Sequence, residues 1–498
     1  MYLEYMIRNH FAGLYSDMLP DARIEKRAEK IMLALFNAGS AVINKSCKTL
    51  AEKEGAYRML ENNSFDHNDL TEGAIRRLRE NVKGGHYLGI QDTTENNFTS
   101  HMGRIGREDK DIGPVTKEDH KNNVKTNAGF FCHPVFVIDA STQMPVGFAS
   151  VILWNRPWDK KNRHEREYKK LDITEKESYR WIESALKTKE SLSEADTITI
   201  IGDRESDIYE IFAAVPDSRT HLLIRANIDR MLTEGIKLNQ KLSSSRMRSV
   251  YEFDVQAGKN RTKHTAKMSL KWEKIKICHP VNKSRKNGSP AFVEMTVIEA
   301  TELAGSVKGG EDPVSWTLLT THSVKTAADA LQCIEWYSQR WLIEELFHLL
   351  KTKGLCFEEA QLESGAGLKK LIILALQVAQ RIMTLRLSLD SSHKVKANII
   401  FSEEEIKFLK IYMKELEGKT EKQKNPYDKG TIQWAAWGIA RMGSWSGYKS
   451  HGPPGYITMK RGLVDFYNKM DGFDILSRYL GKEDLHRMAL RISGELGS

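Results

Sequence analysis

The order of short apolar segments along the chain predicts an α/β fold. Three segments typical of buried β-strands come first, at residues 87–94, 129–139 and 145–155. A helical pattern at 175–193 follows, and two more strand candidates lie at 197–203 and 221–225. Strands that alternate with helices normally form a sheet whose faces the helices cover. We therefore expect a layered α/β core.

A basic segment interrupts the second half of this predicted core. Residues 237–286 contain 14 Lys or Arg and three Asp or Glu, so their net charge of +11 exceeds the +9 of the whole chain. Within about 228–315, apolar residues alternate in places with polar ones, as in half-buried antiparallel strands. A sheet face with this charge suits a polyanion, and nucleic acid is the commonest one. A lysine-rich solubilising surface is the alternative.

A second basic element lies near the start of the chain. A helix over residues 21–36, with Asp21 as its N-cap, would carry apolar side chains on one face and a basic stripe on the other. The stripe consists of Arg23, Lys26, Arg27 and Lys30. An ordinary solvated helix face has the same pattern, so this stripe indicates DNA binding only together with other features.

Two aspartates follow apolar strands of the predicted sheet. Asp92 lies at the end of the first strand, and Asp203 ends the strand at 197–203. The carboxyl ends of adjacent central strands meet at one edge of a sheet, so these two carboxylates can share a pocket. Aspartate also commonly begins a turn after a strand, and that is the alternative for each residue.

A third acid, Glu344, lies on a long helix predicted from about residue 326 to 353. On a helical wheel it shares one face with four other polar side chains, while leucines and Ile343 occupy the opposite face. The four are Tyr337, Arg340, His348 and Lys351. A solvated face stabilised by an Arg–Glu pair would look similar. Three carboxylates would supply the oxygen ligands that Mg²⁺ or Mn²⁺ prefers, and two such ions can promote phosphoryl transfer.

These residues resemble the insertion-sequence-four family of bacterial DDE transposases, and the resemblance covers nearly the whole chain. Its most specific element is a Y-x₂-R-x₃-E-x₆-K signature, formed here by Tyr337, Arg340, Glu344 and Lys351. The family's two metal-binding aspartates match Asp92 in QDTT and Asp203 in DRESD. The stretches EGAYR at 54–58 and GPPG at 452–455 resemble its end-recognition region and its C-terminal tail.

The resemblance implies an α/β, RNase H-like catalytic core with an antiparallel β insertion, flanked by helical N- and C-terminal domains. The expected boundaries are an end-binding domain at 1–80, a core at 81–363 with its insertion at about 228–315, and a dimerisation domain at 364–498. The implied partners are double-stranded DNA, as transposon terminal inverted repeats and as target, and a second copy of the chain in a paired-end complex. No membrane partner is expected.

The resemblance also assigns roles to individual residues. Asp92, Asp203 and Glu344 would hold two Mg²⁺ ions, for which Mn²⁺ can substitute. A larger set would bind DNA or its phosphates: Tyr337, Arg340, Lys351, Arg225, Trp316, His348, Arg23, Lys26, Arg27, Lys30 and Arg58. Among these, Trp316 would stack on a base flipped out of a DNA hairpin, although an ordinary core tryptophan is the alternative.

The implied activity is cut-and-paste transposition by cleavage at both ends, a hairpin intermediate and joining of the 3′-hydroxyls to target DNA. The alternatives are a metal-dependent DNA nuclease of the same fold and an inactive end-binding regulator. Two features lack an expected role: the 111-residue spacing between Asp92 and Asp203, and the charged loop at 99–128. Five dispersed cysteines and the lack of a long apolar run favour a cytoplasmic protein, and the resemblance implies a bacterial protein associated with the nucleoid.

Overall fold

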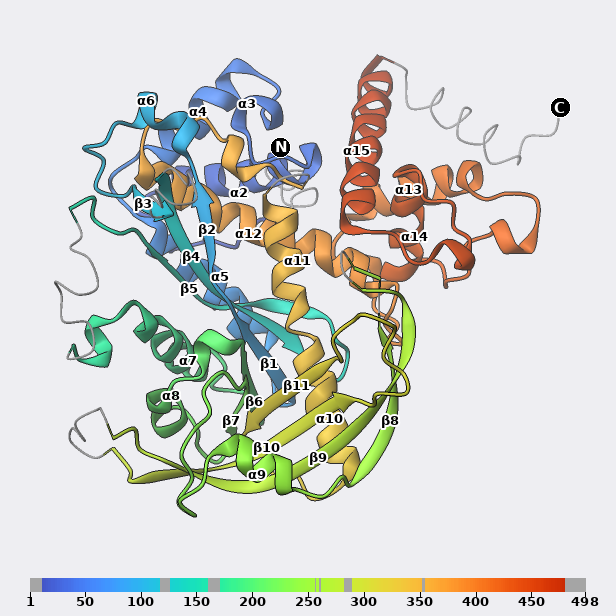
Figure 1. Cartoon of the computed structure of the whole chain (residues 1–498). Coiled ribbons are helices and arrows are strands. Elements are labelled where there is room, and N and C mark those ends of the chain that lie inside the picture. The colour runs from blue at the N-terminus through green and yellow to red at the C-terminus, as the bar shows by residue number, and fades with distance from the viewer. Residues whose placement is uncertain are drawn as a thin grey trace.

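The computed structural model describes residues 11–116, 126–159, 171–255, 257–258, 261–281, 289–351 and 354–479. Its centre is an 11-stranded mixed sheet with helices packed on it (Figure 1). The strand order is β2-β4-β1-β6-β7-β11-β10-β9-β8, and β3 and β5 pair with β4 outside this path. The α/β class predicted from the sequence is therefore confirmed.

Five strands form the part of the sheet that positions the acids. They are β1 (His86–Gln91), β4 (Asn127–Asp139), β5 (Pro145–Trp154), β6 (Thr197–Gly202) and β7 (Thr220–Arg225). β1 runs parallel to β6, and β6 runs parallel to β7, whereas β4 is antiparallel to both β1 and β5. The parallel arrangement brings the carboxyl ends of β1 and β6 to the same edge of the sheet.

Four antiparallel strands extend the sheet beyond β7, at the lower right of Figure 1. In spatial order they are β11 (Ser315–Thr320), β10 (Phe292–Glu302), β9 (His264–Cys278) and β8 (Ser249–Val255), and the short helix α9 (Leu238–Ser244) precedes β8. Buried and more exposed residues alternate along β9, as the sequence pattern predicted.

The open face of this extension is less uniformly basic than the residue count predicted. Lys271 on β9 pairs with Glu299 on β10 at 3.0 Å, and Lys276 pairs with Glu294 at 2.9 Å. The net charge of +11 was counted over residues 237–286 only, so it left out Glu294 and Glu299. The antiparallel register of β9 and β10 places these two acids opposite Lys276 and Lys271. Four basic residues of the segment, Lys259, Lys283, Arg285 and Lys286, lie outside the described residues.

Helices cover both faces of the sheet. Alternate residues of β1 and β6, such as Ile90 and Ile201, share a core with α2 (Ala22–Ala38) and α12 (Gly365–Ser388). The intervening residues, such as Ile200, pack with α7 (Arg180–Ser191) and α8 (Tyr209–Ala214) on the other face. The period-2 alternation of strand side chains thus assigns each residue to one face or the other.

Helices dominate both ends of the described chain. The N-terminal helices are α2, α3 (Ile43–Ser46), α4 (Leu50–Leu60) and α5 (His67–Asn81), and the C-terminal helices are α12, α13 (Glu403–Leu416), α14 (Ile432–Met442) and α15 (Tyr456–Tyr479). The predicted N-cap is confirmed, because the Asp21 side chain accepts a hydrogen bond from the Arg23 backbone. α12 contacts α2, α5, α14 and α15 and so joins the two sets.

α12 is long and apolar enough to cross a membrane by length and composition alone, which the search for uninterrupted apolar runs did not reveal. In the structure, 72% of its apolar window is buried inside the protein. Its neighbours are other helices and β5, so its hydrophobicity is explained by its central place in the core.

Three predicted elements differ in the structure. The strand at 87–94 breaks at Asp92, because β1 ends at Gln91 and the next strand, β2 (Thr94–Asn97), pairs with β4. The helix at 326–353 is two helices, α10 (Ala327–Ser338) and α11 (Trp341–Leu350). The expected loop at 99–128 contains the helix α6 (Met102–Ile105) and the strand β3 (Gly113–Thr116), while residues 117–125 lie outside the described ranges.

Because α10 and α11 are separate helices, a single helical wheel does not describe the side chains from 326 to 353. At the break, the Arg340 backbone N–H donates to Tyr337 O at 3.0 Å and the Leu342 N–H donates to Gln339 O at 3.0 Å. These bonds span three residues instead of four and tighten the turn. Tyr337 therefore lies on α10, Glu344 and His348 lie on α11, and Lys351 is the C-cap residue of α11.

Candidate active site

Asp92 and Asp203 lie directly beyond the carboxyl ends of two neighbouring parallel strands. Asp92 follows Gln91 of β1, and Asp203 follows Gly202 of β6. Both residues continue the alternation of Ile90 and Ile201. That alternation directs their side chains toward the face of the sheet covered by α10 and α11.

Arg340 links the first strand to α11. Its Nη1 donates to Asp92 Oδ2 at 3.2 Å, and its Nη2 forms a short ion pair with Glu344 Oε1. The Asp92 and Arg340 side chains are only 20% and 16% exposed, so these interactions are partly shielded from water. The structure thus brings Asp92 to the Arg340–Glu344 pair, although Asp92 lies 248 residues before Arg340 in the sequence.

The charges of the three acids act on one another. Burial, followed by the negative charges of Asp203 and Glu344, raises the pKa of Asp92 to about 6 against the opposing effects of the Thr93 backbone N–H and Arg340. The Asp92 Oδ1 accepts that N–H at 2.7 Å. Repulsion among carboxylates in a poorly solvated pocket is the condition that a bound cation relieves.

Tyr337 and Arg225 lie beside this group of acids. Burial raises the pKa of Tyr337, and the positive charges of Arg340 and Arg225 oppose that shift. Arg225 ends β7, and its Nη2 donates to Ser315 O at 3.3 Å. Trp316, the residue after Ser315, is half-buried on β11, and its ring lies edge-on to Phe253 at a centroid distance of 4.9 Å.

Two residues of the predicted set lie at the end of α11 away from Arg340. Lys351 Nζ donates to the Glu95 backbone carbonyl on β2 and lies 3.6 Å from Glu358. His348 is exposed one turn after Glu344. In the described residues, Lys351 is therefore linked to the strand after Asp92 and not directly to the acids.

The donor set fits a hard divalent cation. Mg²⁺ and Mn²⁺ prefer carboxylate oxygens, and Asp92, Asp203 and Glu344 supply them. Across the described ranges, no three His, Cys, Asp or Glu side chains already converge closely enough to enclose a metal ion. The Arg340 guanidinium instead bridges Asp92 and Glu344, so metal binding by these acids requires Arg340 to exchange partners.

Sequence reasoning missed three groups beside the site. Asp207 and Arg230 form a buried ion pair at 2.5 Å that fixes the loop after Asp203 to the loop after β7. Trp341, the first residue of α11, is 58% exposed, and its indole N–H donates to Glu345 at 3.0 Å. Arg180 contacts the residue that follows Asp92. Only Asp207 had a sequence signal, as the last residue of DRESD.

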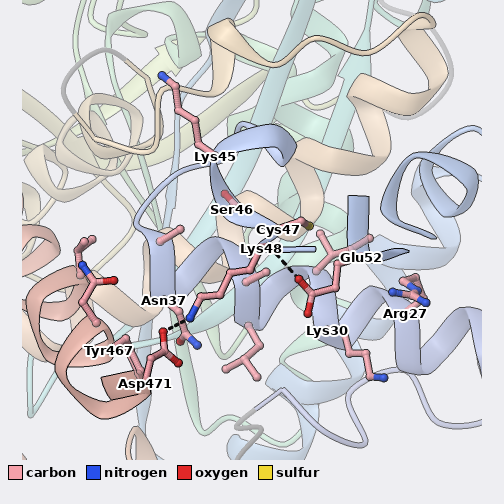
Figure 2. A pocket seen from close by; sticks show the side chains of 16 residues that line it. Arg27, Lys30, Asn37, Lys45, Ser46, Cys47, Lys48, Glu52, Tyr467 and Asp471 are labelled. Atoms are coloured by element: carbon pink, nitrogen blue, oxygen red, sulfur yellow. Dashed lines mark hydrogen bonds and ion pairs between the residues drawn. The ribbon is translucent and has the colours of Figure 1, made fainter. Parts of the chain in front are cut away.

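The basic residues of the N-terminal helices lie mainly on the surface. Arg23, Lys26, Lys30 and Arg58 are exposed, whereas Arg27 is half-buried with its guanidinium against Gly55 of α4. Arg27 and Lys30 help to line a pocket of about 550 Å³ between α2, α3, α4 and α15 (Figure 2). Lys45 and Lys48 add two more cations to this pocket, while Glu52 and Asp471 oppose them, the latter by an ion pair with Lys48.

Comparison with known proteins identifies two regions of the chain. Residues 155–379 match the family profile described as Transposase DDE domain, and residues 15–65 match the profile described as Transposase DNA-binding. The first region contains Asp203 and Glu344 and begins after Asp92. The second contains the basic residues of α2 and α4.

One similar solved structure is a cryo-electron microscopy structure of a piggyBac transposase synaptic complex with hairpin DNA. It has 10% sequence identity and a TM-score of 0.31, and the alignment covers 84% of this chain and 60% of that chain. The present chain thus spans less than two thirds of that transposase. At this TM-score the similarity does not establish a common fold.

Proposed function

We propose that this chain, which carries a transposase DDE domain and a transposase DNA-binding domain, is a cut-and-paste DNA transposase of the insertion-sequence-four family, whose best-known member is the Tn-five transposase. One observation supports the proposal above all others. The charges of Asp203, at the end of a parallel strand, and of the helix residue Glu344 act on the strand-end residue Asp92, and Arg340 pairs with Asp92 and Glu344.

The order of the core strands supports an RNase H-like core. β4 pairs antiparallel with both β1 and β5, and β6 and β7 then continue the sheet parallel to β1. The crossover between β1 and β6 includes α7, and the glutamate helix α11 comes after the antiparallel extension. We propose that this extension is the DNA-contacting insertion of the catalytic core.

The three acids would hold two Mg²⁺ ions, for which Mn²⁺ can substitute. When bound, such ions activate the attacking oxygen and stabilise the leaving oxygen of a phosphodiester. Arg340 would transfer its guanidinium from the carboxylates to a DNA phosphate, which accepts the same two-pronged hydrogen bonding. Arg225 and Tyr337 would hold the same phosphate from β7 and α10, and Lys351 would act from the end of α11.

Further residues would handle the DNA around the reacting phosphate. Trp341 presents an exposed aromatic surface beside Arg340, and Trp316 lies next to Arg225. Aromatic rings at such positions can stack on an unpaired base, as a hairpin intermediate requires. We propose that Arg23, Lys26, Lys30 and Arg58 bind transposon-end phosphates, and that two copies of the chain act in a paired-end complex.

A strand-transfer assay tests the proposed function. The purified chain is incubated with Mg²⁺, labelled DNA that carries the ends of its element, and a supercoiled target. The proposal predicts end cleavage followed by a joined product. Cleavage without joining would identify a nuclease of the same fold, and end binding without cleavage would identify an inactive regulator.

Substitution of the acids tests their assignment. Asp92→Ala, Asp203→Ala and Glu344→Ala should each abolish cleavage while end binding changes by less than about twofold, because the acids serve chemistry rather than DNA affinity. Glu335→Ala is the matched control, since Glu335 is an exposed acid on α10 that hydrogen-bonds Gln143. If one of these three single variants still cleaves DNA, the residue substituted in it does not belong to the active site.

A further inference from the structure

Arg180 joins the two loops that carry the strand-end aspartates. Its Nε donates to Thr93 Oγ1 at 2.9 Å, and its Nη2 donates to Glu205 Oε2 at 2.7 Å. Thr93 directly follows Asp92, and Glu205 lies two residues after Asp203. One rigid guanidinium therefore spans the loop after β1 and the loop after β6.

The surroundings of Arg180 restrict its movement. Its Nη1 donates to Glu177 O at 2.8 Å, so all three guanidinium nitrogens are hydrogen-bonded. Its guanidinium carbon lies 5.2 Å from the Trp154 ring and 5.4 Å from the Trp181 ring. Arginine stacks well on aromatic faces, and its planar fork loses little entropy when it is fixed in this way.

A buried network continues from Thr93 to α7. Thr93 Oγ1 lies 2.9 Å from His133 Nδ1, and His133 Nε2 lies 3.2 Å from Ser184 Oγ. The Ser184 hydroxyl in turn donates to Gln91 Oε1 at 2.6 Å. The residues on both sides of Asp92 are thus tied to α7, on the face of the sheet opposite α11.

Helix stability does not explain an arginine at this position. Arg180 is the first residue of α7, where the partial positive charge of the helix end disfavours a cation. Burial lowers the pKa of Arg180, and the charges of Glu205 and Glu177 oppose that shift. The contacts that compensate for this unfavourable place include those to Thr93 and Glu205, together with the Glu177 carbonyl and the two tryptophan rings.

We infer that Arg180 is a positioning residue, which fixes Asp92 and Asp203 relative to each other so that both can bind the same metal ions. The inference rests on the proposed function. Among the described hydrogen bonds, Arg180 makes none to Asp92 or Asp203. It holds the two aspartates in place through Thr93 and Glu205, which lie in the loops that carry them. Outer groups that orient metal ligands commonly change metal affinity or activity by about 10–100-fold when they are removed.

Mn²⁺ binding to the full-length chain without DNA tests this inference, with free Mn²⁺ followed by electron paramagnetic resonance. Arg180→Gln should weaken Mn²⁺ binding by about tenfold or more. Arg180→Lys should fail to restore the wild-type affinity, because one ammonium cannot hold both loops. Wild-type affinity in either variant would overturn the inference.

Arg156 provides a matched control. It makes a two-pronged ion pair with Glu177 and lies 4.4 Å from the Phe131 ring, which stacks on Trp154. Arg156→Gln should therefore lower thermal stability to a similar extent and leave Mn²⁺ affinity unchanged. Equal losses of Mn²⁺ affinity in Arg156→Gln and Arg180→Gln would show a general effect on folding and overturn the inference.

A milder variant covers the case in which Arg180→Gln does not fold. Glu205 is 65% exposed, so Glu205→Ala removes the acceptor at one end of the bridge without leaving a cavity, while Arg180 keeps its hydrogen bonds to Thr93 and to the Glu177 carbonyl. It should weaken Mn²⁺ binding several-fold, and unchanged binding would contradict the bridge. If the wild-type chain binds Mn²⁺ no better than Asp92→Asn does, the proposed function fails instead.

Discussion

At the scale of single residues, Arg340 lies between two of the carboxylates that are proposed to bind metal ions. It pairs with Asp92 and Glu344, both partly shielded from water. Arg340→Ala should lower the free energy of unfolding of the metal-free chain by about 1–3 kcal/mol, less than for a fully buried pair because water reaches the site. Added Mn²⁺ should then raise the melting temperature of the variant more than that of the wild type.

The control for this prediction is another helix ion pair. Arg386 on α12 pairs with Asp390 at 2.6 Å. Arg386→Ala should also lower the melting temperature, but Mn²⁺ should not restore it. If Mn²⁺ stabilises Arg340→Ala no more than it stabilises the wild type, then Arg340 does not substitute for a metal ion.

At the scale of elements, a cluster of histidines joins the opposite end of the sheet to α10. Thr199 Oγ1 on β6 lies 2.8 Å from His86 Nε2 and 2.7 Å from His322 Nε2, and the His221 ring stacks on His322 at 4.0 Å. Trp336, beside Tyr337 on α10, packs edge-on against His86 at 4.6 Å. A hydroxyl that bridges two neutral rings can donate to one and accept from the other.

This cluster predicts acid sensitivity. Burial, together with the nearby His221, lowers the pKa of His86 to about 4 and that of His322 to about 3. The unfolded chain binds these protons near pH 6.5, so it takes up more protons than the folded chain as the pH falls from about 6.5 to 4. The free energy of unfolding should therefore fall across this range, by up to about 2 kcal/mol per imidazole between pH 7 and pH 5 and by less where water screens the partly exposed rings.

Urea unfolding at pH 7 and pH 5 checks the prediction. The double variant His86→Gln/His322→Gln should lose less stability on acidification than the wild type, whereas His393→Gln, at an exposed histidine, should behave like the wild type. An equal acid loss in the double variant would show that other groups dominate the pH dependence.

Some features of the helices and strands could be predicted from the sequence, and others could not. The strands of the core and the strand-end positions of Asp92 and Asp203 followed from local apolar patterns. The break at Arg340 did not, because the apolar residues that placed the helix on the wheel, Leu342 to Leu350, all lie after the break and carry no signal about the turn before them. The contacts of Arg180 were hidden as well, since its partners Thr93 and Glu205 lie 87 and 25 residues away along the chain.

At the scale of the whole molecule, α12 joins the N-terminal helices to the C-terminal ones. It contacts α2 and α5 as well as α14 and α15, and it shares its core with β1 and β6 (Figure 1). The sequence predicted helical regions at both ends, but not that one apolar helix would connect them. Such tertiary packing depends on which faces meet, and periodicity alone does not specify that.

The central claim is that Asp92, Asp203 and Glu344 form one metal site for phosphoryl transfer. Anomalous diffraction from crystals of the chain with end DNA and Mn²⁺ would locate the ions directly. The account predicts one or two Mn²⁺ peaks within coordination distance of all three carboxylates, with the Arg340 guanidinium moved from them to a DNA phosphate. Mn²⁺ bound elsewhere, or no peak at these acids in crystals whose protein joins DNA in solution, would contradict it.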